Sequence, residues 1–252
     1  FFILYEGGLV LLTIYFITSN EIFMACYTMY IFGDIHEVIK TIDTDSIDFI
    51  YTSPPYGITQ AEWDQPLDWA NLFPELWRVL KPTGIIALHC SMPFTYELLK
   101  YQTPKYHYIW EKNNSTCGML AKKQPLRRTE EVMIYYKKPG TYNPQMKGTT
   151  FYKKDNKQIG TEGQSYYGKR AKKTKIDNEI GHYGNYPDTL LTFPIRREKS
   201  GITRCNDMMD FFIKTYTNIG DTILDLTTHN SCLNDRVVAL KREFIGVDIV
   251  PF

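Results

Sequence analysis

The sequence predicts an α/β fold in which a doubly wound, mostly parallel sheet forms the core. Short apolar runs rich in β-branched and aromatic residues recur along the chain, as buried parallel strands do. Amphipathic stretches lie between several of these runs, and alternation of strands and helices is typical of a sheet with helices on both faces. With 252 residues and 43% hydrophobic composition, the chain is long enough to bury one good core.

The expected strands fall into two groups. The apolar runs read as buried parallel strands at residues 31–32, 47–51, 84–88, 222–226 and 244–249. Two further runs, at residues 106–110 and 132–136, enclose a basic loop and predict an antiparallel edge of the sheet. His89 and Cys90 end one apolar run and are expected to be packed there rather than to bind a metal.

The clearest helix carries one apolar stripe with the spacing i, i+3, i+4, i+7, i+8 and i+11, formed by Trp69, Leu72, Phe73, Leu76, Trp77 and Leu80. A proline inside a helix costs about 3 kcal/mol, so we expect this helix to begin near Pro74 or to kink there. Asp207 is expected to cap a second helix, and Asn234 a third.

Residues 51–57, Tyr-Thr-Ser-Pro-Pro-Tyr-Gly, follow the buried strand and predict a rigid, polar turn. Two prolines fix the backbone and remove two N–H donors, which leaves carbonyl oxygens free to accept beside the Ser53 hydroxyl. Such oxygens suit an amino group that has two hydrogens to donate. Tyr56 is placed to stack on a base that has left its duplex. The alternative reading is a plain Pro-Pro turn that closes a strand.

Residues 52–56 resemble the D/N/S-P-P-Y/F motif of S-adenosylmethionine-dependent DNA amino methyltransferases, which modify adenine N6 or cytosine N4. Three further blocks resemble the same enzymes, at residues 80–84, 110–145 and 212–225. The catalytic block precedes the cofactor block, as in the permuted, beta-class members of phage type. The resemblance therefore implies a methyltransferase-type, Rossmann-like sheet with an irregular basic insertion for DNA.

Roles for individual residues follow from this resemblance. Ser53, Pro54, Pro55 and Tyr56 would be catalytic, and S-adenosyl-L-methionine would be the cofactor. Asp34 would approach its adenine, Asp225 its methionine part and Asp248 its ribose hydroxyls, with Thr227 completing the set. Each aspartate alone also reads as an ordinary strand-end residue. No metal is expected, because no cysteine or histidine spacing fits one.

Charge is unevenly distributed although the net charge is only +1. Residues 112–175 contain 16 Lys or Arg against 4 Asp or Glu, a local charge of +12, while the rest of the chain carries −11. Basic side chains alternate with tyrosines, as on phosphate-tracking surfaces. The predicted DNA-binding residues are Lys122, Lys123, Arg127 and Arg128, and the basic run at residues 169–175 has a solvated loop as its alternative reading.

The expected organisation is a leader of unclear role at residues 1–28, a catalytic half at 29–139, a DNA-facing target-recognition insertion at 140–200 and a cofactor-binding half at 201–252. The apolar run at residues 9–17 is shorter than the roughly 20 residues that span a membrane. Five cysteines without a C-x-x-C pair favour reduced thiols in a cytosol-like compartment. Together with the family resemblance, this implies a cytoplasmic protein encoded by a bacterium or phage.

The expected partner is double-stranded DNA with a flipped target base, and the expected reaction is site-specific methylation of an amino group of adenine or cytosine. A homodimer and a partner restriction endonuclease are left open. The family's glycine-rich turn is replaced by residues 225–233, Asp-Leu-Thr-Thr-His-Asn-Ser-Cys-Leu, and its T-Q-K-P by Thr-Arg-Cys-Asn at 203–206. A weakly active or inactive DNA-binding relative, and an RNA amino methyltransferase, therefore stay open as alternatives.

Overall fold

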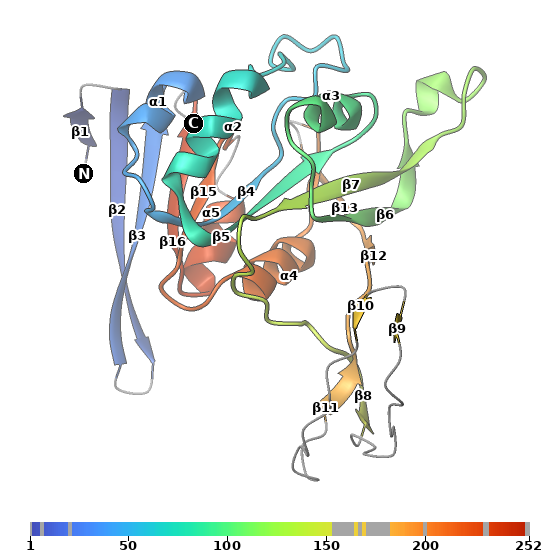
Figure 1. Cartoon of the computed structure of the whole chain (residues 1–252). Helices are drawn as coiled ribbons and strands as arrows, with labels where there is room; N and C mark the ends of the chain where they lie inside the picture. Colours follow the sequence, from blue (N-terminus) through green and yellow to red (C-terminus); the bar gives the residue numbers. More distant parts are fainter. Residues whose placement is uncertain are drawn as a thin grey trace. The chain divides into compact units, whose positions relative to one another are not determined.

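The computed structural model of the chain describes residues 2–5, 8–19, 22–152, 164–165, 168–169, 182–198, 201–228 and 232–249. The chain forms two compact units, one made of Phe1–Asn143 with Asp188–Phe252 and the other of Pro144–Pro187 (Figure 1). The larger unit contains the main sheet and the predicted catalytic and cofactor residues.

Ten strands build the main sheet in the order β1-β2-β3-β16-β15-β4-β5-β7-β6-β12. Their bounds are β1 (Phe2–Tyr5), β2 (Gly8–Ser19), β3 (Ile22–Phe32), β4 (Ile47–Thr52), β5 (Leu80–Cys90), β6 (Tyr106–Thr116), β7 (Arg127–Tyr135), β12 (Leu190–Phe193), β15 (Thr222–Asp225) and β16 (Glu243–Asp248). The five strands from β3 to β5 in this order run parallel. β7 is antiparallel to both β5 and β6, which confirms the predicted antiparallel segment.

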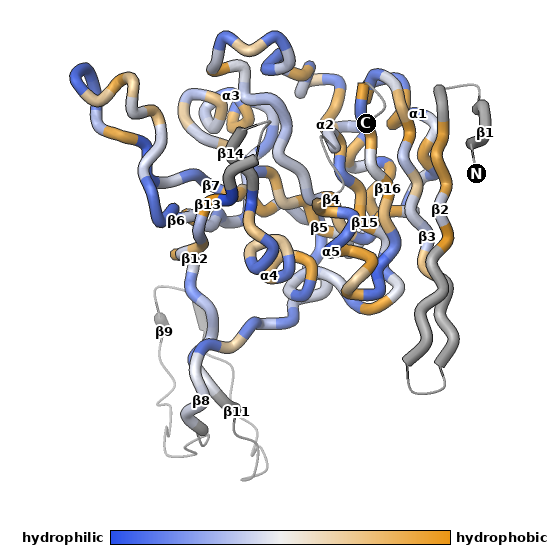
Figure 2. The backbone as a smooth tube through the Cα atoms, turned by 180° about the vertical axis from the view of Figure 1, so that it is seen from behind, coloured by the Kyte–Doolittle hydropathy of each residue, from blue (hydrophilic) through white to orange (hydrophobic). Residues whose placement is uncertain are grey.

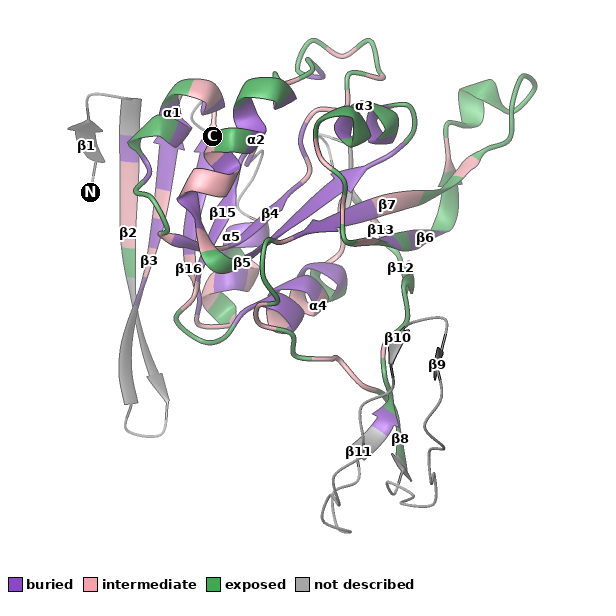
Figure 3. Ribbon diagram, in the orientation of Figure 1, coloured by how far each residue is buried: buried purple, intermediate pink, exposed green. Residues whose placement is uncertain are grey.

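Helices cover both faces of this sheet. The helices are α1 (Ile35–Thr41), α2 (Trp69–Val79), α3 (Phe94–Tyr101), α4 (Asn206–Tyr216) and α5 (Cys232–Ala239). Buried side chains of α1, α2 and α3 share one hydrophobic cluster, whereas those of α4 and α5 belong to a second cluster that holds other strand residues. In Figure 3 the central strands are buried between these helices. The doubly wound α/β prediction is confirmed.

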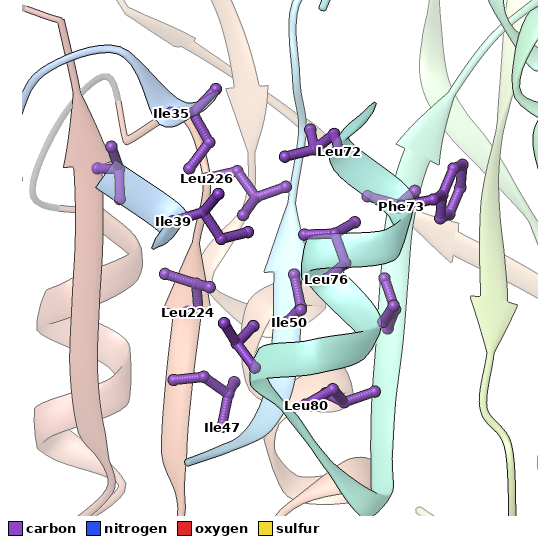
Figure 4. Close-up of a cluster of buried hydrophobic side chains, with 14 of the residues drawn as sticks. Ile35, Ile39, Ile47, Ile50, Leu72, Phe73, Leu76, Leu80, Leu224 and Leu226 are labelled. Atoms are coloured by element: carbon purple, nitrogen blue, oxygen red, sulfur yellow. The ribbon is translucent and has the colours of Figure 1, made fainter. Parts of the chain in front are cut away.

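The apolar stripe of the predicted first helix lies on α2. Leu72 and Leu76 are fully buried against Ile47 and Ile50 of β4 and Leu224 of β15, as Figure 4 shows. Each such side chain contributes about 1.5–3 kcal/mol on burial, so the stripe as a whole outweighs the cost of an interior proline.

Of the two expectations for Pro74, a helix start near it is wrong, and a kink at it stays a prediction. α2 begins at Trp69, and Pro74 lies inside it. The Asp68 side chain caps the helix by accepting from the backbone N–H groups of Ala70 and Asn71 at 3.1 and 3.3 Å. An aspartate cap satisfies otherwise unpaired donors, which fixes the start of the helix upstream of the proline.

The two other predicted caps are also wrong. α4 begins at Asn206, so Asp207 lies in its first turn, where a carboxylate still favours the helix dipole. Asn234 lies inside α5 and is buried. Its side-chain oxygen accepts a hydrogen bond from the Thr28 hydroxyl at 2.7 Å, so it ties the helix to β3 instead of capping it.

The boundary expected at residue 28 falls inside β3. β2 pairs with β3 along a continuous antiparallel register from Leu9↔Phe32 to Ser19↔Ile22, so the apolar run at residues 9–17 is part of this hairpin. Figure 2 shows hydrophobic residues along the parts of β2 and β3 that it colours by hydropathy. Within the described residues, no helix is long and apolar enough to cross a membrane.

The described residues of the smaller unit form two short antiparallel pairs. β8 (Lys147–Tyr152) pairs with β11 (His182–Asn185), and β9 (Gln164–Ser165) pairs with β10 (Gly168–Lys169). Another pair, β13 (Ile195–Glu198) with β14 (Gly201–Arg204), belongs to the larger unit. Most of the predicted basic run at 169–175 lies outside the described residues, so its role stays a prediction.

Candidate active site

The order of the central sheet reverses between β15 and β4. β15 continues through α5 to β16 on one side, whereas β4 continues through α2 to β5 on the other. The two helices leave on opposite faces of the sheet, so the carboxyl ends of β15 and β4 diverge at a topological switch point. Ligands in open α/β sheets bind at such points.

Ser53, Asp225 and Thr227 meet at this switch point. The Thr227 hydroxyl donates to the backbone carbonyl oxygen of Ser53 at 3.4 Å and lies 3.3 Å from the Thr52 hydroxyl. The Thr227 backbone N–H donates to a carboxylate oxygen of Asp225 at 3.4 Å. The structure therefore places a predicted catalytic residue beside two predicted cofactor-binding residues.

The turn after β4 presents a serine hydroxyl and a phenol together. The Ser53 Oγ lies 3.4 Å from the Tyr56 hydroxyl, and both residues are half-buried. The Tyr56 ring stacks on Phe94 of α3, with ring centroids 5.2 Å apart and planes 16° apart. Phe94 thus supports one face of the Tyr56 ring.

The loop that follows the turn is fixed by one carboxylate. Asp64 accepts from the backbone N–H groups of Gly57, Ile58 and Thr59 at 2.7 to 3.0 Å. Burial alone would raise the pKa of Asp64, but these hydrogen bonds and one from the Thr59 side chain hold it below its usual value. Gly57 has a φ of +64°, and a Cβ there would lie 2.7 Å from Pro66, so glycine is required.

Glu130, near the beginning of β7, contacts the turn through Tyr56. It accepts a hydrogen bond from the Tyr56 hydroxyl at 3.4 Å and forms an ion pair with Lys112 of β6. The Lys112 side chain is only 3% exposed and lies over the Trp110 ring. Burial, with the nearby Glu130 charge, raises the pKa of Tyr56 well above its ordinary value, so the phenol stays protonated.

Sequence reasoning missed Glu130, Lys112 and Phe94 as parts of the site. The two consecutive acidic residues directly before the expected strand at 132–136 were the available signal for Glu130. Carboxylates next to a buried strand need partners, and partners of buried charges are informative about sites.

A buried polar cluster lies behind the switch point. The Arg204 guanidinium lies 5.0 Å from the centroid of the Tyr51 ring, and the Tyr51 hydroxyl is 3.1 Å from Nε2 of His89. Burial lowers the pKa of His89, with Arg204 adding to the effect, so the imidazole is neutral. Burial raises the pKa of Asp225, although Arg204 acts in the opposite direction. Among the described residues, Nη1 of Arg204 has no hydrogen-bond partner.

Asp248 is the last residue of β16, and Asp34 lies two residues after the end of the neighbouring strand β3. The Gly33 N–H donates to the Asp248 carbonyl oxygen at 2.8 Å, which joins the two strand ends. The Asp34 carboxylate caps α1 by accepting from the His36 N–H at 2.8 Å. Asp34, Asp225 and Asp248 thus line one edge of the sheet, and their roles toward a ligand stay predictions.

The predicted DNA-binding residues lie in the connection between β6 and β7 and at the start of β7. Lys122 and Lys123 are exposed, and Arg128 donates to a carboxylate oxygen of Glu111 at 3.1 Å. Met119, in the 3₁₀-helix η1 (Gly118–Leu120), is fully exposed. Figures 2 and 3 show this connection as exposed and mixed in hydropathy.

His89 and Cys90 are buried at the end of β5, which confirms that they are packed there. Within the described ranges, no group of three or more histidine, cysteine or acidic side chains is arranged to hold a metal ion. The variant turn after Asp225 is only partly visible, because residues 229–231 lie outside those ranges.

Comparisons with known proteins give a family and a fold. Residues 47–251 match the family model described as DNA methylase. The chain is 22% identical over 233 residues to the type II methyltransferase M.HpaI of Haemophilus parainfluenzae, covering 84% of this chain and 67% of the relative. It is 25% identical over 243 residues to the DNA adenine methyltransferase YhdJ of Escherichia coli K12, covering 87% and 77%.

The fold resembles that of the solved PvuII DNA methyltransferase, described as cytosine-N4-specific. The TM-score is 0.59 at 13% sequence identity, and the match covers 89% of this chain and 82% of the other. At this identity the likeness establishes the fold of the sheet and its helices.

Proposed function

The chain belongs to the DNA methylase family that modifies adenine N6 or cytosine N4, and we propose that the turn at residues 53–56 carries out the transfer. The protein is a site-specific, S-adenosyl-L-methionine-dependent DNA amino methyltransferase. The main support for the proposal is the contact between Ser53 and Thr227 at the switch point. It joins the catalytic turn to the cofactor edge, which is the end of the parallel strands where Asp34, Asp225 and Asp248 lie.

The residues at this edge fit the cofactor by their chemistry. Asp34, Asp225 and Asp248 are acceptors, which suit the amino, ribose and adenine donors of S-adenosyl-L-methionine. The buried Nη1 of Arg204, which lacks a partner among the described residues, suits the carboxylate of the methionine part. Asp225, Arg204 and Thr227 would hold the methionine part, with Asp34 and Asp248 toward the adenosine.

The catalytic turn would orient the target amine. The nitrogen of an exocyclic amino group is a poor nucleophile because its lone pair is delocalised into the ring. The Ser53 hydroxyl and the Pro54 carbonyl oxygen accept its two hydrogens, which favours tetrahedral geometry and directs the lone pair away from the turn. This is preorganised stabilisation of the transition state.

The bond changes are few. When bound, S-adenosyl-L-methionine would supply the methyl group from its sulfonium and would leave as the neutral thioether, which keeps the electron pair of the broken carbon–sulfur bond. The amine nitrogen forms the new bond to carbon and releases one proton to solvent. Ser53 and Tyr56 are half-buried, so water reaches the turn.

The free face of Tyr56 would hold the target base. Because Phe94 supports one face of the ring, a flipped adenine or cytosine stacks on the other. Lys122, Lys123 and Arg127 would contact DNA phosphates, while Arg128 is already paired with Glu111 and contributes less. A homodimer and a partner endonuclease remain predictions.

The experiment is a transfer assay with labelled S-adenosyl-L-methionine on unmethylated plasmid DNA and on structured RNA. Mass spectrometry of the nucleosides distinguishes N6-methyladenine from N4-methylcytosine. We expect transfer to DNA by the wild-type protein and a loss of about 100-fold or more with Ser53→Ala, since one preorganised hydrogen bond contributes that much. Preferred transfer to RNA, or equal activity of Ser53→Ala, would contradict the proposal.

A further inference from the structure

A chain of hydrogen bonds links the catalytic serine to a buried ion pair. Ser53 Oγ is 3.4 Å from the Tyr56 hydroxyl, which donates to Glu130 Oε2 at 3.4 Å, and the other oxygen of Glu130 pairs with Lys112. Glu130 lies opposite Trp110 on the neighbouring strand β6, two residues before Lys112 on that strand.

The chemistry of the end group fixes the direction of this chain. An ionised carboxylate only accepts hydrogen bonds, so the Tyr56 hydroxyl donates its single hydrogen to Glu130. The Tyr56 oxygen then accepts a hydrogen bond from the Ser53 hydroxyl, which donates its single hydrogen to Tyr56. The lone pairs of the Ser53 oxygen are left for the target amine.

A serine in the first position of the motif needs this control more than the other residues found there. The side-chain oxygens of asparagine and of ionised aspartate only accept, whereas a hydroxyl can donate or accept and rotates freely. A Ser53 hydrogen turned toward the amine would oppose the hydrogens of the substrate. The neighbouring groups must therefore set its orientation.

We propose that Glu130, held by Lys112, is a positioning residue that makes Ser53 an acceptor toward the target amine. This inference rests on the proposed function of the turn at residues 53–56. Lys112 has a side chain that is 3% exposed and that of Glu130 is 20% exposed, so the pair is largely withdrawn from water. The contact with the Lys112 ammonium therefore holds the Glu130 carboxylate in place beside Tyr56.

Glu130→Gln tests the direction of the chain with little change in shape. The Lys112 ammonium only donates, so it attracts the carbonyl oxygen of the new amide and turns the NH₂ toward Tyr56. Tyr56 then accepts from the amide and donates toward Ser53, and the Ser53 hydrogen is released toward the amine. We expect kcat to fall by roughly 10- to 100-fold with KM for DNA and cofactor within about twofold.

Glu131→Gln is the matched control. Glu131 is the next residue of β7, and it accepts from the Thr95 hydroxyl at 3.0 Å instead of contacting Tyr56. We expect its kcat to stay within about twofold of the wild type, because only the Glu130 change reverses the chain. Equal losses in the two variants would overturn the inference and indicate a merely structural role.

Ser53→Asn provides a background in which the orientation of a hydroxyl no longer matters. There, Glu130→Gln should lower kcat by less than about threefold, because an amide oxygen accepts whatever Tyr56 does. A full loss in both backgrounds would overturn the inference. If Glu130→Gln alone keeps full activity while Ser53→Ala is inactive, the inference fails and the proposed function stands. If Ser53→Ala is active, the proposed function itself fails.

A spectroscopic arm needs no turnover. In protein with ¹³Cζ-labelled tyrosine, Tyr56→Phe identifies the Tyr56 signal by its loss. Glu130→Gln should move that signal, since it reverses the hydrogen bonds of the phenol, and Glu131→Gln should leave it in place. An unmoved Tyr56 signal in Glu130→Gln would contradict the chain.

Discussion

The Thr227 hydroxyl donates a 3.4 Å hydrogen bond to the Ser53 carbonyl oxygen, although the two residues are 174 positions apart in the chain. One residue follows β15 and the other follows β4, and these strands are parallel neighbours in the sheet. The contact directly joins a predicted cofactor-binding residue to the catalytic turn at residues 53–56. It fixes the relative position of the two residues at the switch point.

Replacing Thr227 by valine removes this hydrogen bond and preserves the shape of the side chain. A neutral hydrogen bond contributes about 1 kcal/mol, so we expect kcat to fall about fivefold as Ser53 becomes less well placed. Steady-state kinetics with thermal unfolding measures both effects. An unchanged kcat would show that the contact does not position Ser53.

Removing the Tyr56 ring should strongly lower turnover. Stacking on an aromatic ring contributes about 1–3 kcal/mol per base, so Tyr56→Ala lowers kcat by roughly 100-fold while the affinity for cofactor, measured by calorimetry, changes little. Tyr101→Ala, at an exposed tyrosine of α3, is the control and should retain activity. An active Tyr56→Ala variant would remove the stacking role.

Asp225→Asn should raise the melting temperature of the protein and weaken its binding of S-adenosyl-L-methionine. Burial raises the pKa of Asp225 in the folded state, so ionisation of Asp225 lowers the free energy of unfolding. Protonated Asp225 contributes its full stability below the pKa of the unfolded state. That stability is lost as the pH rises through the pKa of the folded state. The variant should therefore melt at a higher temperature than the wild type at about pH 8, with the difference shrinking toward about pH 4.

The same variant should bind S-adenosyl-L-methionine about 10-fold or more weakly, since hydrogen bonds to a charged group contribute about 1.5–3 kcal/mol. Calorimetric titration at neutral pH measures the loss. Unchanged affinity together with raised stability would assign Asp225 a structural role only.

Lys122 and Lys123 are predicted to contact DNA phosphates. The double alanine variant should weaken binding equally on all sequences, and the slope of log affinity against log salt should flatten by about 1.8 if both contact phosphates. Fluorescence anisotropy across a salt series gives the slope. Lys40→Ala, at an exposed lysine of α1, is the control and should leave the slope unchanged.

Much of the sheet could be predicted from the sequence because its central strands are buried on both faces. Ile47, Ile50 and Leu224 are fully buried, and continuous apolar runs of this kind are the sequence signature of parallel strands. Proximity of Ser53 and Thr227 follows from the same prediction, since the carboxyl ends of parallel strands share one edge.

Glu130 could not be placed in this way. Glu130 lies near the beginning of β7, and β7 runs antiparallel to β5. The first residues of β7 therefore lie beside the last residues of β5, as in the pairing of Cys90 with Glu131. The predicted caps failed for a different reason. Asn234 has a tertiary partner in Thr28 that local sequence does not reveal, so a long-range hydrogen bond overrides the local capping preference.

The most direct measurement is a crystal structure of the protein with S-adenosylhomocysteine and a duplex that contains the methylated sequence. We predict that the target amino nitrogen lies within hydrogen-bond distance of the Ser53 Oγ and the Pro54 carbonyl oxygen, with its base stacked on the face of Tyr56 that Phe94 leaves free. A target base that remains in the duplex, or that is bound away from Ser53, would contradict the account.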